Sequence, residues 1–248
     1  MMQKKTGNFI VTGIWVILFI LFTVLIQIVD VHTIGPKSSS VGFASINGPI
    51  HEFLGVHTLW YSITYWLGFV PLSTAGIFAA VGLKQLIQRK SLLKVDKSII
   101  ALGVFYTAVI LVYILFEIYI VNYRPILIDG YLEASYPSSH TMLACCFMAA
   151  AMLECGLLVK NKKINGIVRV VSIIIMAVMV IGRLVSGAHW FTDIIGGLLI
   201  SGALIMGLYS VLSMLQEKHT RKGRRKHVLY ISDRNPGGGE DHHGRISV

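Results

Sequence analysis

The chain has 248 residues, of which 54% are hydrophobic and only 14% are charged. Soluble domains carry roughly 25% charged residues, so this composition excludes a single soluble domain and indicates an integral membrane protein. The net charge of +10 is divided among short clusters between apolar runs, which is typical of membrane topology signals and not of a nucleic-acid-binding face.

Six apolar runs are long enough to cross a bilayer, since one helical span needs about 20 residues. We expect spans at Phe9–Val29, Thr58–Val81, Ile99–Tyr123, Thr141–Val159, Ile164–Val185 and Phe191–Leu215. No convincing signal-peptide cleavage site follows the first run, so we interpret it as a retained anchor. The sequence therefore predicts an all-α, polytopic membrane protein with a six-span domain at residues 1–215.

Lysine and arginine residues predict the orientation of these spans. They cluster before the first span, after the second, after the fourth and after the sixth, and six spans place all four clusters on one side. Positive residues favour the cytoplasmic side, so we expect both termini in the cytoplasm. The outer side then holds the loop Asp30–His57, whose mixed polarity is compatible with an interfacial helix, the connection Asn122–His140 and the turn Ser186–Trp190.

Residues 216–248 form a tail that begins with basic residues and ends in a Gly-rich polar stretch. This composition predicts a disordered cytoplasmic segment. Its basic start would lie against anionic lipid of the inner leaflet, or it serves only as a stop-transfer signal.

Five ionisable residues converge on the predicted outer side, at the ends of four successive spans: Arg124, His140, Arg183, His189 and Asp193. Ionisable residues at membrane depth are costly and mark functional sites by default. The two arginines offer bidentate donors that suit phosphate oxygens. The sequence therefore predicts an anion site at the outer mouth of the bundle.

Two serines add further donors to this site. Ser138 and Ser139 follow Pro137 and open the fourth span, where they cap the helix or present hydroxyl groups. The free N–H groups of that first turn also favour an anion. We therefore expect both serines beside the bound phosphate.

The histidines supply reactive groups. His189 and Asp193 are four residues apart and share one helical face, so the carboxylate can hold the Nδ1 proton and leave Nε2 as a nucleophile. His140 remains as a general acid for a leaving alkoxide. Taken singly, the PSSH stretch is also compatible with an ordinary helix start, and the His189–Asp193 pair with a structural hydrogen bond. Together these residues predict cleavage of a phosphate ester through a phosphohistidine.

Three segments resemble the motifs of the type 2 phosphatidic acid phosphatase family, the membrane lipid phosphate phosphatases. That family shows K-x6-R-P, P-S-G-H and S-R-x5-H-x3-D. The corresponding segments here are EIYIVNYRP (Glu117–Pro125), PSSH (Pro137–His140) and GRLVSGAHWFTD (Gly182–Asp193). The resemblance implies a six-helix bundle with its active site near the outer leaflet and no metal or other cofactor.

The resemblance also implies individual roles. His189 resembles the nucleophile, Asp193 its orienting partner, and His140 the acid that protonates the leaving group. The implied phosphate ligands are Arg124, Arg183 and Ser138.

The chain departs from the family pattern at Glu117, Ser139 and Gly182, where the family has lysine, glycine and serine. Glu117 lies seven residues before Arg124, so we expect it two helical turns away on nearly the same face and about 10 Å deeper. Four roles are open for Glu117. It pairs with Arg124 or Arg183, it is protonated at that depth, it donates or accepts a hydrogen bond with a headgroup hydroxyl, or its charge impairs the enzyme. We favour an active enzyme with altered substrate preference.

The leading hypothesis is a cell-membrane phosphatase that hydrolyses a lipid phosphate or diphosphate at the outer face. Candidate substrates are undecaprenyl diphosphate, phosphatidylglycerophosphate and phosphatidate. The alternatives are a lipid phosphotransferase and a non-catalytic binder or transporter of lipid phosphates. The expected partners are the lipid substrate and membrane lipids, without nucleic acid.

Overall fold

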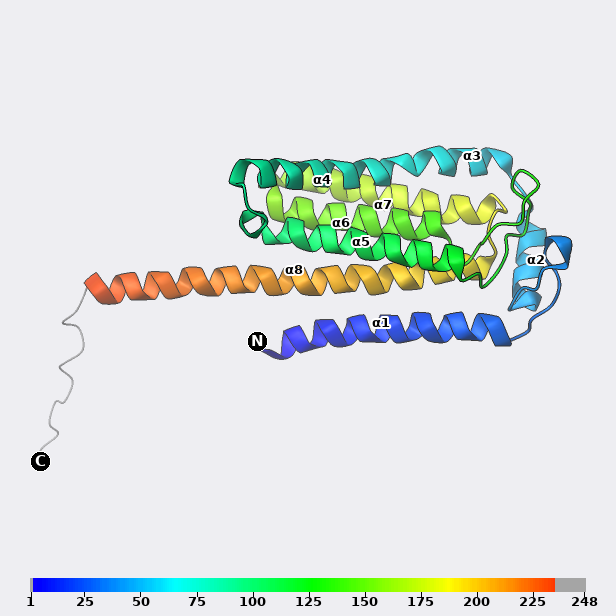
Figure 1. Cartoon of the computed structure of the whole chain (residues 1–248), viewed down its shortest axis with the longest axis horizontal. Helices are drawn as coiled ribbons and strands as arrows, with labels where there is room; N and C mark the ends of the chain where they lie inside the picture. Colours follow the sequence, from blue (N-terminus) through cyan, green and yellow to red (C-terminus); the bar gives the residue numbers. More distant parts are fainter. Residues whose placement is uncertain (1, 235–248) are drawn as a thin grey trace, which may run out of the picture.

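The structure, a computed structural model, describes the backbone of residues 2–234 and the side chains of residues 7–217. Its α-helices are α1 (Met2–Ile28), α2 (Ala44–Leu54), α3 (Thr58–Leu67), α4 (Phe69–Arg89), α5 (Lys97–Ile118), α6 (Ser139–Leu158), α7 (Lys162–Val185) and α8 (Phe191–Arg234). Short 3-10 helices lie at Pro36–Ser38 (η1) and Leu92–Lys94 (η2). Figure 1 shows the long helices side by side in one bundle, with α2 across one end.

The described chain contains six candidate membrane spans, which confirms the prediction of an all-α protein with six spans. They are Gly7–Ile28, Thr58–Arg89, Lys97–Ile118, Ser139–Leu158, Lys162–Val185 and Phe191–Glu217. The second span consists of α3 and α4, which meet at Gly68. The start of α1 and the end of α8 point to the same side of the molecule (Figure 1). Which side faces the cytoplasm stays a prediction.

Helix α6 lies at the centre of the bundle and packs against α4, α5, α7 and α8. Small side chains, among them Ala144, Cys146 and Ala150, are fully buried along it. Small residues allow helix backbones to approach closely in a membrane, where no hydrophobic effect drives helices together. The other spans expose many leucine, isoleucine and valine side chains, as lipid-facing helices do.

One predicted boundary was wrong. The third span ends at Ile118 and not at Tyr123, because the chain leaves the helix for a loop that returns on itself through a bridge between Tyr123 and Ala134. Arg124 therefore lies in a loop, and the expected shared helical face of Glu117 and Arg124 does not exist. Helix α8 continues beyond the sixth span to Arg234, residues 235–248 lie outside the described part, and the disorder expected of the tail stays a prediction.

Helix α2 is anchored on the start of α8 by a buried asparagine. The Asn47 side chain donates to Thr192 Oγ1 at 2.9 Å, and its Oδ1 accepts from the Thr192 N–H at 3.1 Å. A buried amide that satisfies both of its polar atoms holds one geometry, because other arrangements leave polar groups unpaired. This anchor fixes the loop 30–57 against the turn that precedes α8.

Candidate active site

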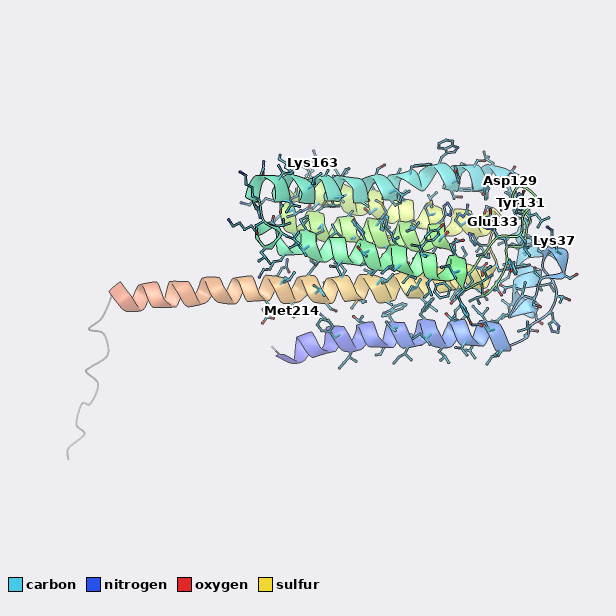
Figure 2. The ribbon with its side chains drawn as sticks, in the orientation of Figure 1. Lys37, Asp129, Tyr131, Glu133, Lys163 and Met214 are labelled. Carbon is cyan, nitrogen blue, oxygen red and sulfur yellow. The ribbon has the colours of Figure 1, made fainter. Side chains whose placement is uncertain are left out.

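The ionisable residues of the predicted site meet at the end of the bundle where α2 lies. They come from the loop between α5 and α6, from the first turn of α6, from the end of α7, from the turn between α7 and α8, and from the start of α8. Figure 2 shows Asp129, Tyr131 and Glu133 of that loop at this end, opposite Lys163. The turn Ser186–Trp190, between α7 and α8, is buried throughout.

His189 lies between two guanidinium groups. Its Nε2 is 3.3 Å from Arg124 Nη1 and 3.2 Å from Arg183 Nη2, and all three side chains are buried. Arginine donates and does not accept, so Nε2 must be the unprotonated ring nitrogen in this arrangement. The proton of the neutral ring is therefore on Nδ1, and a lone pair on Nε2 faces the positive charges.

The opposite ring nitrogen contacts Ser135. Nδ1 of His189 lies 3.1 Å from the Ser135 carbonyl oxygen, which accepts its proton, and 3.1 Å from Ser135 Oγ. The Ser135 hydroxyl donates a short hydrogen bond to Asp193 Oδ2. Asp193 Oδ2 is itself 3.8 Å from Nδ1. The carboxylate thus acts on the histidine both directly, across a long contact, and through Ser135.

Asp193 is fully buried in the first turn of α8. Its Oδ2 accepts from the Trp190 N–H at 2.8 Å, and its Oδ1 accepts from Asn122 Nδ2 at 3.5 Å. A carboxylate at a helix N-terminus is stabilised by free N–H groups and by the helix dipole. These contacts hold Asp193 in one position beside His189.

Arg124 is fixed by its loop. Its Nε lies 3.1 Å from Glu133 Oε2, and its backbone N–H donates to the Glu133 carbonyl at 3.1 Å. Its Nη1 also approaches the Ala188 carbonyl at 3.4 Å. The loop that replaces the end of the third span therefore aims this guanidinium at the histidine.

Arg183 is completely buried on α7. Its Nη1 donates to Thr64 Oγ1 at 3.4 Å, and its guanidinium lies 5.0 Å from the centre of the Tyr61 ring. Both partners come from α3, and a cation over an aromatic face is favourable. Arg183 keeps its charge in a buried position because α3 supplies these contacts.

Gly182 lets α3 reach this arginine. A Cβ atom at Gly182 would lie 2.6 Å from Thr64 Cγ2 and 3.1 Å from Trp60. The serine of the family motif would therefore collide with α3 as it packs here. This close approach gives a structural reason for glycine at that position.

Burial of the His189 ring, and then the charges of Arg124 and Arg183, hold its pKa well below the ordinary value of 6.5. Burial disfavours the charged ring, and two neighbouring cations disfavour it further. His189 is therefore neutral at physiological pH, which is the state that a nitrogen nucleophile requires.

His140 lies in the first turn of α6, within electrostatic range of both arginines. Its Nδ1 is buried without a hydrogen-bond partner in the described part. The ring borders an apolar cavity of about 140 Å³ between α4 and α6. The cavity is lined by Tyr65, Gly68, Phe69, Pro71, Leu72, His140, Leu143, Ala144 and Met179.

The two serines of the PSSH stretch have different surroundings. Ser138 is buried, and its Oγ accepts from the Thr141 N–H at 3.5 Å as the N-cap of α6. Its own N–H donates to the Asp193 carbonyl at 3.0 Å. Ser139 is half-buried and lines a separate small cavity with Glu117 and Ser135. The structure thus shows the capping role for Ser138, and phosphate contact by either serine stays a prediction.

Glu117 is exposed, next to the last residue of α5, and its carboxylate interacts with Tyr113. Pairing of Glu117 with Arg124, which was one of its open roles, is not what the structure shows, because Arg124 pairs with Glu133. The physical reason is the early end of α5, which turns the chain and brings Glu133 beside Arg124.

Five residues that support the site were not predicted from the sequence, and the structure places them in contact with it. They are Tyr61, Thr64, Asn122, Glu133 and Ser135. Only Ser135 carried a local signal, since it directly precedes the Tyr-Pro-Ser segment. Among the described residues, no group of three or more His, Cys, Asp or Glu side chains is arranged to hold a metal ion.

Comparison with known proteins identifies the family to which the chain belongs. The family model described as PAP2 superfamily matches residues 53–217. No curated protein sequence gives a significant match. Among solved structures, the chain resembles one described as the first transmembrane PAP2 type phosphatidylglycerolphosphate phosphatase from Bacillus subtilis. The two chains are 17% identical, the alignment covers 82% of this chain and 96% of that one, and the TM-score is 0.58. At this identity the likeness shows a shared fold.

Proposed function

Because the chain belongs to the PAP2 superfamily as a multi-pass membrane lipid phosphate phosphatase, we propose that it hydrolyses its substrate through a phosphohistidine on His189. One observation carries this proposal: the unprotonated Nε2 of His189 lies between the guanidinium groups of Arg124 and Arg183. A phosphoryl group held by the two arginines places its phosphorus next to this lone pair.

In the first step, Nε2 attacks phosphorus, the N–P bond forms and the bond from phosphorus to the leaving oxygen breaks. His140 donates a proton to that oxygen, so the leaving lipid departs as an alcohol or a lipid monophosphate. The ring becomes cationic as it accepts the phosphoryl group. Asp193 stabilises this charge directly and through Ser135, while both arginines neutralise the phosphoryl oxygens.

In the second step, a water molecule attacks the phosphohistidine. His140, now unprotonated, takes a proton from that water, the N–P bond breaks and inorganic phosphate leaves. His189 returns to its neutral state with the Nδ1 proton held by Ser135. Ser138 and Ser139 are proposed to assist through the N-terminal turn of α6.

The first part of the lipid chain, next to the phosphate, is proposed to lie in the apolar cavity beside His140. This places the scissile oxygen near the proposed acid and the chain between α4 and α6. The candidates are undecaprenyl diphosphate, phosphatidylglycerophosphate and phosphatidate. The B. subtilis protein of similar fold is described as a phosphatidylglycerolphosphate phosphatase, which makes this lipid the first to test.

The active site is proposed to face the extracytoplasmic side. The basic clusters lie at the opposite end of the bundle, and positive residues favour the cytoplasm. This orientation places both termini and the tail from residue 216 in the cytoplasm, and residues 1–215 form the phosphatase domain.

The test is phosphate release from a panel of these lipids by purified protein in detergent. Wild type should release phosphate and form an acid-labile phosphoenzyme, and His189→Ala should abolish both. His32→Ala is the matched control, because His32 is an exposed histidine outside the site. A phosphoenzyme that forms equally in His189→Ala would overturn the proposal.

Two other activities give different outcomes of the same experiment. A phosphotransferase would form the phosphoenzyme but yield a new phospholipid and little free phosphate, which mass spectrometry identifies. A non-catalytic binder would bind lipid phosphates with an affinity that falls in Arg124→Ala and Arg183→Ala, without phosphate release.

A further inference from the structure

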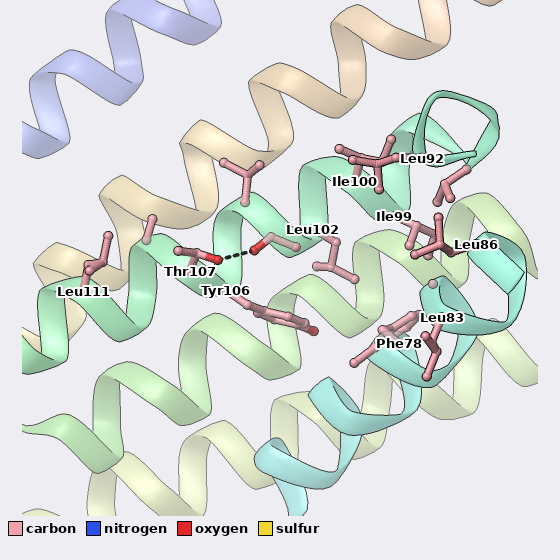
Figure 3. A pocket seen from close by; sticks show the side chains of 16 residues that line it. Phe78, Leu83, Leu86, Leu92, Ile99, Ile100, Leu102, Tyr106, Thr107 and Leu111 are labelled. Atoms are coloured by element: carbon pink, nitrogen blue, oxygen red, sulfur yellow. Dashed lines mark hydrogen bonds between the residues drawn. The ribbon is translucent and has the colours of Figure 1, made fainter. Parts of the chain in front are cut away.

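A further cavity lies between α4 and α5, toward the end of the bundle that carries the termini. Its volume is about 720 Å³, within the range of small-molecule binding sites. Figure 3 shows its walls, with Phe78, Leu83 and Leu86 on α4 and Leu102, Tyr106 and Leu111 on α5. Thr107 also lines it, but its hydroxyl already donates to the Gly103 carbonyl at 3.0 Å. We call this cavity the α4–α5 groove.

The position of the groove determines what can fill it. Its walls belong to the candidate spans Thr58–Arg89 and Lys97–Ile118, so it opens to hydrocarbon and not to water. An apolar cavity in that layer is filled by hydrocarbon chains, because empty space forfeits dispersion contacts on every wall. The groove is therefore suited to the acyl chains of a lipid.

The connection between the two helices closes one end of the groove and carries positive charge. Leu92 and Val95 line the groove, and Lys90 and Lys94 belong to the same connection, as the C-cap of α4 and the last residue of η2. Neither lysine pairs with a carboxylate among the described residues, and the nearby Asp96 is already paired with Arg89 at 2.7 Å. The rim of the groove thus has an excess of positive charge.

The same connection exposes apolar side chains. The exposed fractions of Leu92 and Leu93 are 62% and 91%. Exposed leucines beside lysines are suited to the headgroup region of a bilayer, where apolar side chains enter the acyl boundary and ammonium groups meet phosphates.

We propose that the α4–α5 groove binds one anionic phospholipid from the leaflet on the side of the termini. Its acyl chains lie against α4 and α5, and Lys90 and Lys94 bind its headgroup phosphate. This site is separate from His189 and does not depend on the proposed reaction. Phosphatidylglycerol and phosphatidylcholine are suitable probes, because neither carries the phosphate monoester or diphosphate that the proposed active site cleaves.

The groove can be filled by a single substitution. A Cβ atom at Gly103, which lines the groove, meets nothing within 4 Å, so Gly103→Trp introduces a ring at the groove wall with no clash at its Cβ. Gly76 on α4 is equally open but outside the lining, so Gly76→Trp is the matched control. Native mass spectrometry should show one phosphatidylglycerol bound to wild type and to Gly76→Trp, and at least about tenfold weaker binding to Gly103→Trp.

The charge on the rim is tested separately. In the double variant Lys90→Gln/Lys94→Gln, the ratio of the affinity for phosphatidylglycerol to that for phosphatidylcholine should fall roughly tenfold or more. Lys162→Gln/Lys163→Gln removes the same charge from the same end of the bundle, at the start of α7, and should keep the preference (Figure 2).

The proposal is overturned if wild type binds both lipids equally, or if Gly103→Trp binds phosphatidylglycerol as tightly as Gly76→Trp does. It is also overturned if the mass spectrum shows a dimer that Gly103→Trp dissociates, since a second copy of the chain then fills the groove. If Gly103→Trp does not fold, Gly103→Leu and the two lysine pairs still decide the question. Phosphate release by these variants is a separate readout, so failure of the proposed reaction leaves this test intact.

Discussion

Arg124 and Glu133 form an ion pair across the loop between α5 and α6, with Arg124 Nε 3.1 Å from Glu133 Oε2. Arg124 is buried, whereas the Glu133 side chain is 44% exposed. The pair therefore places a negative charge at the mouth of a site that we propose to bind phosphate. Glu133 orients the arginine and at the same time reduces the positive potential there.

We expect Glu133→Gln to lower the KM for a lipid phosphate about two- to fivefold, with little change in kcat. The substitution removes the competing negative charge, while the backbone contact and Nη1 contact of Arg124 keep the guanidinium in place. Steady-state phosphate release with one lipid substrate measures this effect. A rise in KM would contradict it and show that the orienting role of Glu133 dominates.

We expect Glu117→Lys, which restores the family residue, to raise kcat/KM for dianionic lipid phosphates about two- to fivefold. The effect is small because Glu117 contacts Tyr113, whereas Arg124 is already paired with Glu133. Glu117→Gln is the control, since it removes the negative charge without adding a positive one, and its effect should be smaller. Loss of activity in both variants would instead indicate that the carboxylate contacts the substrate.

We expect Ser135→Ala to lower kcat about 10- to 100-fold and to leave KM nearly unchanged. Ser135 is a positioning residue, because its hydroxyl connects Asp193 to Nδ1 of His189, whereas the proposed nucleophile is Nε2. Ser135→Thr keeps a hydroxyl at this position and should restore much of kcat. A purely structural role of Ser135 would predict equal loss in both variants, accompanied by a lower unfolding temperature.

The low pKa of His189 predicts a pH dependence with a defined sign. The attacking ring must be neutral, and its pKa lies well below 6.5, so protonation of His189 should not limit kcat/KM until the pH is well below that value. Arg124→Gln removes one neighbouring positive charge, which raises the pKa and moves the acidic limb of the profile to higher pH.

The comparison of wild type with Arg124→Gln uses the same substrate, so ionisation of the substrate phosphate cancels. An unchanged acidic limb would mean that the charge of Arg124 does not act on His189.

The low pKa of His189 also affects the stability of the folded protein. The unfolded chain binds this proton more readily than the folded one, so the shift favours unfolding as the pH falls below 6.5.

The spans and the central motif could be predicted because they depend on local sequence. Apolar length defines a membrane helix whatever its neighbours are. His189 lies in the turn before α8, and Asp193 lies in the first turn of α8, where the helix N-terminus favours a carboxylate. The end of α5 could not be predicted from local sequence, because residues 119–123 are apolar enough to continue the span. Their conformation depends on the bridge between Tyr123 and Ala134.

The residues that support the site could not be predicted from the sequence either. Tyr61 and Thr64 carry no motif, and they become partners of Arg183 only because Gly182 lets α3 pack closely against α7. The α4–α5 groove arises in the same way, from the distance between two helices that each look like an ordinary span. Such features depend on how side-chain volumes fit between helices, which no single segment encodes.

The amino-acid sequence by itself therefore determined the six apolar spans and the presence of two arginines, two histidines and an aspartate at their ends. Only the tertiary structure decided that Ser135 lies between Asp193 and His189, and that Glu133, not Glu117, pairs with Arg124. The physical reason is that hydrophobicity acts on each segment separately, whereas hydrogen bonds and ion pairs require atoms within about 3 Å of each other. Those distances are set where the chain leaves α5 and enters α6.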